Sequence, residues 1–537
     1  MTTLDSRILS PRALGALAGL CVAVGGPATA LAAPADYYDA TEMEAAIDLL
    51  DGAAGGRVTV HTIGMTPNGH KTRAIHLSAL GPGGVQPDDT GDKPALLVEC
   101  GMHAREWAGP QNCLLFVQGF VLATLFHPSR VDDILANADI WVLPMVNPDG
   151  RDMDDTSGGD PTNFWTSTIF HPATSSDTAG WRDNAQTVDC PAAPGGNGAG
   201  IDLNRAFSKG WNSGQSNCLH NQFHGEWPFQ AKEARILRRF VNNRMISMSL
   251  SVHSFRPCVG AQNGGSGVPQ TFQSIWNGAV ADPNMQLNYA PGTCSGAGVG
   301  QFTAWMARPS DTGFERDHST KRGAVSMLLE LAPNGASYND PVTLSPYRNA
   351  LGDGSNPFHP SDDNYLRTVA RPFFKSLMYL AEQARSPWCA IDPLTLAPDP
   401  SCTQDFGLTG SKIANCEDCV GKMIFKTAGG ESYERMPAGK RRVVYRVQNF
   451  DSSSAGTVQV TVVISSRPAG SGAYSTDLVN TDVYSLASTA GDTGSVPFAF
   501  TAGRDYMVSI NTWAISFPGS SDTNGDNGHH LFRFETY

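Results

Sequence analysis

The sequence predicts two globular parts, an α/β domain with helices on both faces of its sheet and a smaller all-β sandwich after it. From residue 36 to about 385, apolar strand-like runs alternate with longer helical patterns, which is typical of an α/β domain. Beyond a proline-rich segment at 391–402, short strands lie among Gly, Ser, Thr and Asp turns, as in β-sandwiches. The 537 residues exceed one ordinary domain, which also favours two.

Within the α/β part, the hydrophobic pattern assigns each element. The stretch 246–252 alternates between apolar residues and serine, which predicts a strand with one large and one small face. The predicted strands are 95–100, 141–146, 246–252 and 324–331. The predicted helices are 41–50, with Thr41 as its cap, 111–126, 231–242 and 365–384.

In the β-rich part, four short runs predict strands of a sandwich of ordinary domain size. These runs are 443–447, 458–464, 507–510 and 531–534. We therefore expect four segments along the chain: an N-terminal segment 1–33, an α/β domain 34–390, a linker 391–410 and a β-sandwich 411–537.

The N-terminal segment predicts export. Arg7 and Arg12 precede a small apolar stretch at 13–24, and a small-residue site follows at 27–33. A positive region, a short apolar region and an Ala-x-Ala site define a cleaved signal peptide. A short membrane anchor or a core helix is the alternative. We expect a secreted protein, extracellular or periplasmic, with ten cysteines left after cleavage, an even number suited to disulfides.

Charge and hydropathy exclude several classes of protein. The formal net charge is −13, so a nucleic-acid binder that relies on a basic surface is not expected. With 41% hydrophobic and only 17% charged residues, the chain does not have the composition of a disordered protein. We find no apolar run beyond the N-terminus long enough to span a bilayer, and expect no stable membrane insertion.

A histidine and a glutamate follow the first predicted strand at metal-ligand spacing. His103 and Glu106 are three residues apart, so in a turn they can bind one Zn²⁺ together. His253, at the end of the serine-alternating strand, is a candidate third ligand. Two His and one Glu with an open fourth position would make a catalytic zinc site. The alternative is a chance pair that caps a helix.

Other polar residues fit such a site. Asn204 and Arg205 are adjacent, and an Arg beside an Asn is suited to binding a carboxylate. Glu330 is an acid in an otherwise apolar strand, where an unpaired carboxylate is costly. A role as a general base beside a metal would explain its presence there.

Six motifs occur in the order seen in zinc carboxypeptidases of the carboxypeptidase A/B type, and the chain resembles that family over about residues 36–385. The motifs are His103-Ala-Arg-Glu-Trp107, Asn147-Pro-Asp-Gly150, Trp181-Arg182, Asp202-Leu-Asn-Arg205, Val252-His-Ser254 and Leu329-Glu-Leu331. The resemblance implies a mixed twisted sheet and a secreted, bacterial-like member without a pro-domain.

The resemblance also implies a role for each residue. His103, Glu106 and His253 would hold one zinc ion, with Asp202 orienting a ligand imidazole. Glu330 would be the general base and Arg182 would stabilise the oxyanion. Asn204 and Arg205 would bind the terminal carboxylate of the substrate, and Arg105 the residues upstream of the bond. Tyr289 is our candidate for the mobile tyrosine of the family, with an ordinary loop tyrosine as the alternative, and Phe255 replaces a usual Tyr.

Several cysteine pairings follow. The resemblance implies a disulfide between Cys190 and Cys218. Cys258 is expected to pair with Cys294, whereas Cys100 and Cys113 are expected to be buried thiols. In an exported chain, the remaining cysteines favour disulfides over a metal or redox site: Cys389, Cys402, Cys416 and Cys419.

We therefore expect a secreted zinc metallocarboxypeptidase, a monomer that removes residues from peptide or protein C-termini. The alternatives are a zinc peptidase acting on bacterial cell-wall peptides and a non-catalytic binding protein on a peptidase scaffold. Asp311, Glu315 and Asp317 would favour basic leaving residues if they face the site, although solvated loop charges are the preferred interpretation.

Overall fold

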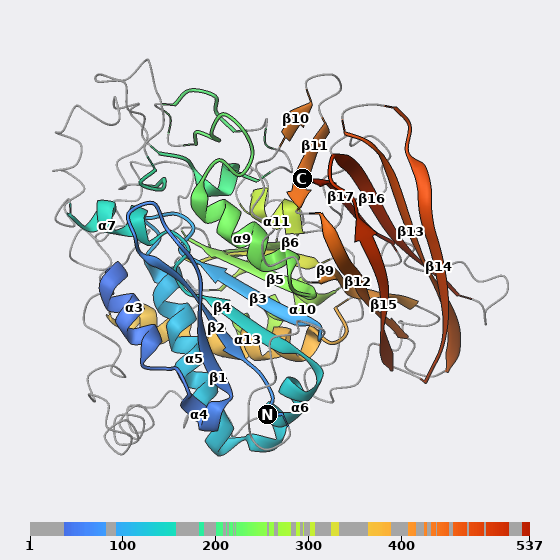
Figure 1. Cartoon of the computed structure of the whole chain (residues 1–537). Coiled ribbons are helices and arrows are strands. Elements are labelled where there is room, and N and C mark those ends of the chain that lie inside the picture. The colour runs from blue at the N-terminus through green and yellow to red at the C-terminus, as the bar shows by residue number, and fades with distance from the viewer. Residues whose placement is uncertain are drawn as a thin grey trace.

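In the computed structural model, the first part of the chain forms one mixed eight-stranded sheet (Figure 1). The strand order is β1-β2-β4-β3-β5-β8-β6-β7. The four central strands β4, β3, β5 and β8 are parallel, and the strands next to them, β2 and β6, run antiparallel to them. The strands are β1 Val58–Met65, β2 Lys71–Leu77, β3 Ala95–Cys100, β4 Asp139–Leu143, β5 Ile246–His253, β6 Cys258–Ala261, β7 Asn288–Tyr289 and β8 Val325–Glu330.

The described residues cover most of both parts of the chain. They are 37–81, 93–156, 182–186, 200–207, 211, 214–218, 220, 222–254, 257–261, 267–280, 286–289, 294, 301–306, 324–331, 363–387, 406–414, 424–426, 431–436, 438–449, 455–469, 472–487, 490–514 and 529–536. The predicted signal segment 1–33 lies outside them.

The alternation in β5 divides the sheet into two faces. Met248, Leu250 and Val252 belong to the core on one face, while Ser249 and Ser251 lie on the other. The strand predicted at 246–252 is confirmed with one residue added. The strand predicted at 141–146 instead lies at Asp139–Leu143. It ends before residue 144 because proline has no N–H to donate to the sheet.

Helices cover both faces of this sheet, as the sequence predicts. Residues of α3, α5, α10 and α13 belong to the core on one face, and residues of α9 and α11 to the core on the other. The helices are α3 Ala40–Asp48, α4 Ala53–Gly56, α5 Ala108–Phe126, α6 Pro128–Asn137, α7 Pro148–Thr156, the 3-10 helix η3 Leu203–Arg205, α9 Lys232–Asn242, α10 Val268–Ala279, α11 Gln301–Met306 and α13 Asp363–Gln383.

The cap of α3 differs from the prediction. Asp39, not Thr41, caps this helix, because the Glu42 N–H donates to Asp39 Oδ1 (2.7 Å) and the Asp39 N–H donates to Glu42 Oε2 (3.1 Å). This reciprocal pair is a capping box. The helix therefore begins one residue earlier than expected.

The long helix α5 corrects the expectation about membrane-length segments. Ala108–Phe126 is long and apolar enough to cross a membrane by length and composition alone. Most of it is buried between the sheet and α13, and only its last turn exposes Leu125 and Phe126. This burial is that of a core helix, and such helices pass the same test of length and hydropathy.

The second part of the chain is all β, with two sheets packed face to face, which confirms the predicted fold class (Figure 1). One sheet has the order β10-β11-β17-β16-β13-β14 and the other β15-β12-β9. The strands are β9 Phe406–Ala414, β10 Ile424–Lys426, β11 Glu431–Met436, β12 Gly439–Asn449, β13 Gly456–Pro468, β14 Ser475–Leu486, β15 Gly491–Phe500, β16 Arg504–Ala514 and β17 His529–Thr536.

The β-rich part begins earlier along the chain than the predicted linker 391–410 suggests. Strand β9 already begins at Phe406, inside that segment. Met245, just before β5, packs against Val444 of β12, and both side chains are buried. The β-sandwich therefore contacts the α/β part directly.

Two disulfides join elements around the sheet. Cys258 is bonded to Cys294, as predicted. Cys100 is bonded to Cys113, so the expectation of two buried thiols is wrong, and this bond ties the end of β3 to α5. Cys218 is disulfide-bonded, but Cys190 lies outside the described residues and that pairing stays a prediction. The other four predicted disulfide cysteines also lie outside the described residues.

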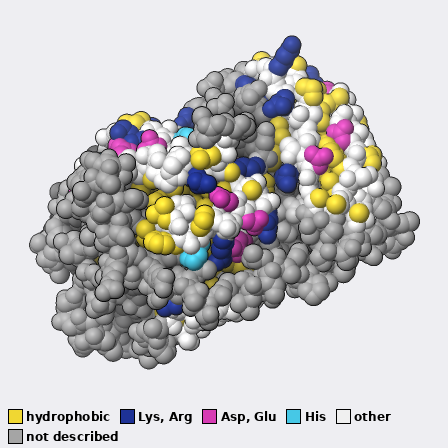
Figure 2. Space-filling view, turned by 90° about the horizontal axis from the view of Figure 1, so that it is seen from below, with side chains coloured by type: hydrophobic (Ala, Val, Ile, Leu, Met, Phe, Trp, Pro, Cys, Tyr) yellow, Lys and Arg dark blue, Asp and Glu magenta, His cyan; other side chains and the backbone are white. Residues whose placement is uncertain are grey.

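The described surface charges are mixed in sign. On the face shown in Figure 2, the described Lys and Arg side chains are scattered, and several lie beside Asp or Glu. The described part of this face therefore carries no continuous basic patch of the kind that binds a phosphate backbone.

Candidate metal centre

The three predicted zinc ligands meet at the carboxyl ends of neighbouring parallel strands. His103 and Glu106 lie in the loop that follows β3, and His253 is the last residue of β5. The two strands pair in parallel, with Cys100 opposite Val252, so their ends coincide. Open α/β sheets bind ligands in the crevice outside the carboxyl ends of their strands. Strand order thus brings together residues 150 positions apart in sequence.

The loop after β3 turns at a glycine that permits no other residue without strain. Gly101 has φ +68°, in the left-handed region. A Cβ at this position would also lie 2.9 Å from Pro110 Cγ, at the start of α5. Only glycine therefore lets the chain leave β3 and present His103 toward β5.

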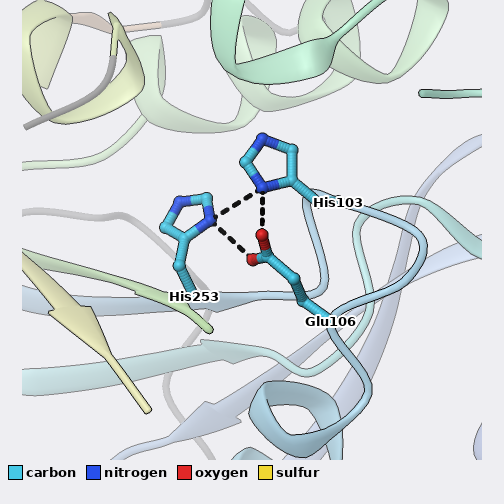
Figure 3. Close-up of side chains that lie close together, drawn as sticks. All are labelled: His103, Glu106 and His253. Carbon is cyan, nitrogen blue, oxygen red and sulfur yellow. Dashed lines mark hydrogen bonds and ion pairs between the residues drawn. The ribbon is translucent and has the colours of Figure 1, made fainter. Parts of the chain in front are cut away.

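The donor atoms of the three residues converge (Figure 3). His103 Nδ1 lies 2.6 Å from Glu106 Oε1, and His253 Nδ1 lies 2.9 Å from Glu106 Oε2. The two Nδ1 atoms are 3.1 Å apart. One donor atom from each residue thus lies within 4.8 Å of the others, and all three side chains are buried.

This donor set fits zinc. Zinc prefers imidazole nitrogen and carboxylate oxygen, and catalytic sites supply three protein ligands and leave a fourth position open. Burial lowers the pKa of His253, but the carboxylates of Glu106, Glu330 and Glu99 outweigh it and raise that pKa to about 9. Burial also raises the pKa of Glu106, but the two imidazoles hold it far below its usual range. The carboxylates of Glu106, Glu330 and Glu99 thus favour positive charge at His253, which a bound cation would supply in place of a proton.

Asp202 supports His103 from the side away from this pocket. Asp202 Oδ1 lies 3.3 Å from His103 Nε2, and Arg182 Nε donates to Asp202 Oδ2 at 2.9 Å. Burial raises the pKa of Asp202, but Arg182 and His103 outweigh it and hold that pKa well below its usual range. An ionised Asp202 keeps the proton of His103 on Nε2, which leaves the Nδ1 lone pair for a metal.

Glu330 reaches the site through the register of the sheet. It is the last residue of β8 and lies directly opposite His253 of β5. Residues opposite each other in a parallel pair point to the same face of a sheet. Glu330 is half-buried, and its charge acts on the His253 imidazole. The structure therefore places this carboxylate beside the proposed ligands.

The predicted substrate-binding residues differ in the contacts that their side chains make. Asn204 is buried beside the site, but its Oδ1 accepts the Phe302 N–H (3.1 Å) and its Nδ2 lies 3.4 Å from His253 Nε2. Its amide is therefore engaged within the protein. Arg205 Nη1 donates to the Asn204 carbonyl (3.0 Å), and Arg105 is buried. Arg182 Nη1 lies 3.9 Å from Glu106 Oε1, within reach of the pocket.

The structure does not bring Tyr289 to this site. Its ring packs against the core that contains Val259 and Leu329, on the sheet face of α10 and α13. Glu330 follows Leu329 and so points to the opposite face. The interpretation of Tyr289 as the mobile tyrosine is thus unsupported, and its partial burial is that of an ordinary packed tyrosine. Trp181, Phe255 and the acidic residues at 311–317 lie outside the described residues.

Sequence reasoning missed two polar residues on the face of the sheet that carries His253. Glu99 in β3 is fully buried, and Ser251 in β5 lies opposite it. Burial raises the pKa of Glu99 to about 7, opposed by the charge of His253 and the Ser251 hydroxyl. The signal that singled out Glu330, an acid within an apolar strand, was equally present at Glu99.

Glu233 anchors the segment that carries Arg182. Asn184 Nδ2 donates to Glu233 Oε2 (2.8 Å), and Asn184 Oδ1 accepts the Ile201 N–H (3.0 Å) next to Asp202. Burial raises the pKa of Glu233 from 4.5 to about 7. Between these values the folded protein keeps a proton that the unfolded chain has released. Stability therefore falls as pH rises through this window.

We expect Glu233→Gln to reduce this pH dependence while keeping the bond to Asn184 through the amide oxygen. At pH 8 the variant should be more stable by about 3 kcal/mol, because one pKa unit corresponds to about 1.36 kcal/mol. At pH 4 it should match the parent. Urea unfolding of both proteins at the two pH values, with zinc removed, measures the difference. Equal stability at pH 8 would show that the fold does not raise the pKa of Glu233.

The comparisons with known proteins agree with this geometry. Residues 43–274 match the family model described as zinc carboxypeptidase. The matched region contains His103, Glu106, Asp202 and His253 but ends before Glu330.

The curated relatives match over part of their length. The chain is 32% identical to human carboxypeptidase B over 34% of this chain and 37% of that protein. It is 26% identical to rat carboxypeptidase B, over 52% and 59%, and 26% identical to the inactive metallocarboxypeptidase ECM14 of Saccharomyces cerevisiae, over 38% and 41%. These matches thus span less than two thirds of each relative.

Solved structures match at lower sequence identity. A crystal structure of thrombin activatable fibrinolysis inhibitor has a TM-score of 0.46 and 18% identity, covering 65% of this chain and 75% of that chain. The carboxypeptidase A of Helicoverpa armigera has a TM-score of 0.45 and 18% identity, covering 66% and 74%.

Proposed function

We propose that this protein is a zinc-dependent carboxypeptidase that hydrolyses the C-terminal peptide bond of peptides and proteins. One observation carries the proposal: two imidazole nitrogens and a carboxylate converge in a buried pocket, and Glu330 lies directly opposite His253. A purely structural metal site would be closed by a fourth protein ligand and would need no such carboxylate. Among the described residues, the cluster offers three ligands.

Activity has to be argued from these residues, because one of the matched relatives is named as inactive. Both parts that hydrolysis needs are present in this chain: a complete ligand set and a carboxylate beside it. All of the proposed ligands come from a single chain. The site therefore does not require a second copy, and we propose that the protein acts as a monomer.

The residues suggest how the reaction proceeds. A zinc ion held by His103, Glu106 and His253 would act as a Lewis acid and activate water at neutral pH. Glu330 would take a proton from the attacking water and pass it to the leaving amine. Arg182, held by Asp202 and within reach of the pocket, would stabilise negative charge that develops on the carbonyl oxygen.

Selection of the last peptide bond requires recognition of a free carboxylate. Arg205 supplies a cation whose Nη1 donates to the Asn204 carbonyl and whose charge interacts with Asp202, the partner of His103. Asn204 is engaged with Phe302 and His253, so we assign the main role in carboxylate binding to Arg205. An arginine is suited to this task because its planar guanidinium can donate two parallel hydrogen bonds to a carboxylate.

A matched pair of peptides tests this proposal. We expect the zinc-loaded protein to release the last residue from a peptide with a free C-terminal carboxylate. The amidated peptide should be cleaved about 10- to 150-fold more slowly, because a charged hydrogen bond contributes about 1.5–3 kcal/mol. Mass spectrometry of the products measures both rates. Equal cleavage of the two peptides, or cleavage at internal bonds, would contradict the proposed exopeptidase.

We also propose that the protein is secreted. The support comes from the sequence: the basic residues Arg7 and Arg12, the apolar stretch 13–24 and the small residues at 27–33. The disulfides Cys100–Cys113 and Cys258–Cys294 suit an oxidising compartment.

A further inference from the structure

Glu99 is a buried carboxylate for which the fold alone gives no reason. It lies in β3, fully buried, on the same face of the sheet as Ser251 and His253. Its Oε2 accepts a hydrogen bond from Ser251 Oγ (2.7 Å), and its Oε1 has no hydrogen-bond partner among the described residues. Burial of a half-satisfied carboxylate costs free energy, so an apolar residue here would be the more stable choice.

Ser251 links this carboxylate to a proposed zinc ligand. Its Oγ lies 2.9 Å from His253 Nε2. A serine hydroxyl has one proton, and here that proton is donated to Glu99. The oxygen can then only accept from His253, which requires the imidazole proton to be on Nε2. In the neutral imidazole that binds a metal, this leaves the lone pair on Nδ1, the nitrogen that lies close to Glu106 and His103.

A rival contact would have the opposite effect. Asn204 Nδ2 lies 3.4 Å from the same His253 Nε2, and its Oδ1 already accepts the Phe302 N–H, so the amide presents N–H to the imidazole. An amide that donated to Nε2 would place the imidazole proton on Nδ1, where it would block a metal. The Ser251 contact is the shorter by 0.5 Å, and the charge of Glu99 strengthens it.

We propose that Glu99 is a positioning residue for the metal centre, which acts through Ser251 to hold the proton of His253 on Nε2 and keep Nδ1 free for zinc. The inference rests on the proposed function, since it takes zinc as the ligand of this site. Each ligand histidine is then oriented by a carboxylate: His103 directly by Asp202, and His253 by Glu99 through one hydroxyl.

Zinc affinity and thermal stability separate this role from a structural one. In Glu99→Leu the acceptor is removed, and the buried Ser251 hydroxyl keeps His253 Nε2 as its partner. We expect its zinc affinity to fall by about 10- to 100-fold, the usual effect of losing such a partner. The melting temperature of the zinc-free variant should equal or exceed that of the parent, because an unpaired buried carboxylate is removed. Competition with a chelator on the intact chain measures the affinity.

Substitutions of two serines in β5 complete the test. Ser251→Ala should weaken zinc binding as Glu99→Leu does. The double variant should bind zinc no more weakly than the weaker single variant, because both substitutions interrupt the same relay, the hydrogen-bonded chain from Glu99 through Ser251 to His253. Ser249→Ala is the matched control: Ser249 lies on the same strand and face, but its hydroxyl bonds Ser326 Oγ (2.7 Å). It should bind zinc as the parent does. If Glu99→Leu does not fold, Ser251→Ala decides alone.

The outcomes distinguish the two proposals. If the parent binds zinc and both relay variants bind it equally well, the role of Glu99 is refuted while the proposed function stands. Independent, additive losses, or the same loss in Ser249→Ala, would also refute it. If the parent binds no zinc, the proposed function fails and the relay with it.

Discussion

Glu330→Gln is expected to lower kcat on a C-terminal peptide substrate by about 10²- to 10⁴-fold, the usual contribution of a general base. The amide is nearly the same size as the carboxylate but cannot accept the proton of the attacking water. Glu330 is opposite His253 but is not among the proposed ligands, so the zinc content should stay at one ion per chain. Steady-state kinetics together with metal analysis of the same sample measure both quantities.

Glu44→Gln is a suitable control for this variant. Glu44 lies on α3, against the opposite face of the sheet, and pairs with Lys71 at the surface. Its loss should leave kcat unchanged. If Glu330→Gln kept the activity of the parent while it held zinc, another group would have to be the base, and the proposed chemistry would be wrong.

His253→Gln is expected to abolish zinc binding and, with it, the peptidase activity. His253 is one of three ligands, and its Nδ1 faces both of the other two. Loss of a ligand should weaken zinc binding by more than the 10- to 100-fold, in order of magnitude, that loss of a supporting partner causes. Zinc content after dialysis against a weak chelator measures the effect.

A second histidine controls for nonspecific loss. His70 is also paired with a carboxylate, Asp152 at 2.7 Å, but lies outside the three-residue cluster. His70→Gln should therefore retain one zinc per chain. A His253→Gln protein that folds and keeps its zinc would rule out the proposed ligand set.

The fold was predictable where hydrophobic pattern alone decides. The run at 95–100 became β3 residue for residue, because every position of this central strand is buried. Boundaries set by other forces were missed. Strand β4 ends before residue 144 through a missing backbone donor, and the cap of α3 is an aspartate that precedes the helical pattern. The start of β9 inside the expected linker depends on pairing with β12, which sequence pattern does not reveal.

The site was predictable in its ligands and less so in their surroundings. His103, Glu106, His253 and Glu330 follow strands directly, so knowing the strands suffices to place them. The positions of Tyr289 and Asn204 depend on which face β7 presents and on the contact with Phe302. The relay from Glu99 through Ser251 needs the register between β3 and β5, and only the folded sheet provides it.

The most direct test of the central claim is anomalous X-ray diffraction at the zinc edge from crystals of the intact protein. The account predicts one strong anomalous peak per chain, between His103 Nδ1, a Glu106 carboxylate oxygen and His253 Nδ1, on the side that Glu330 faces. Zinc bound elsewhere on the chain, with these three side chains bonded only to one another, would contradict it.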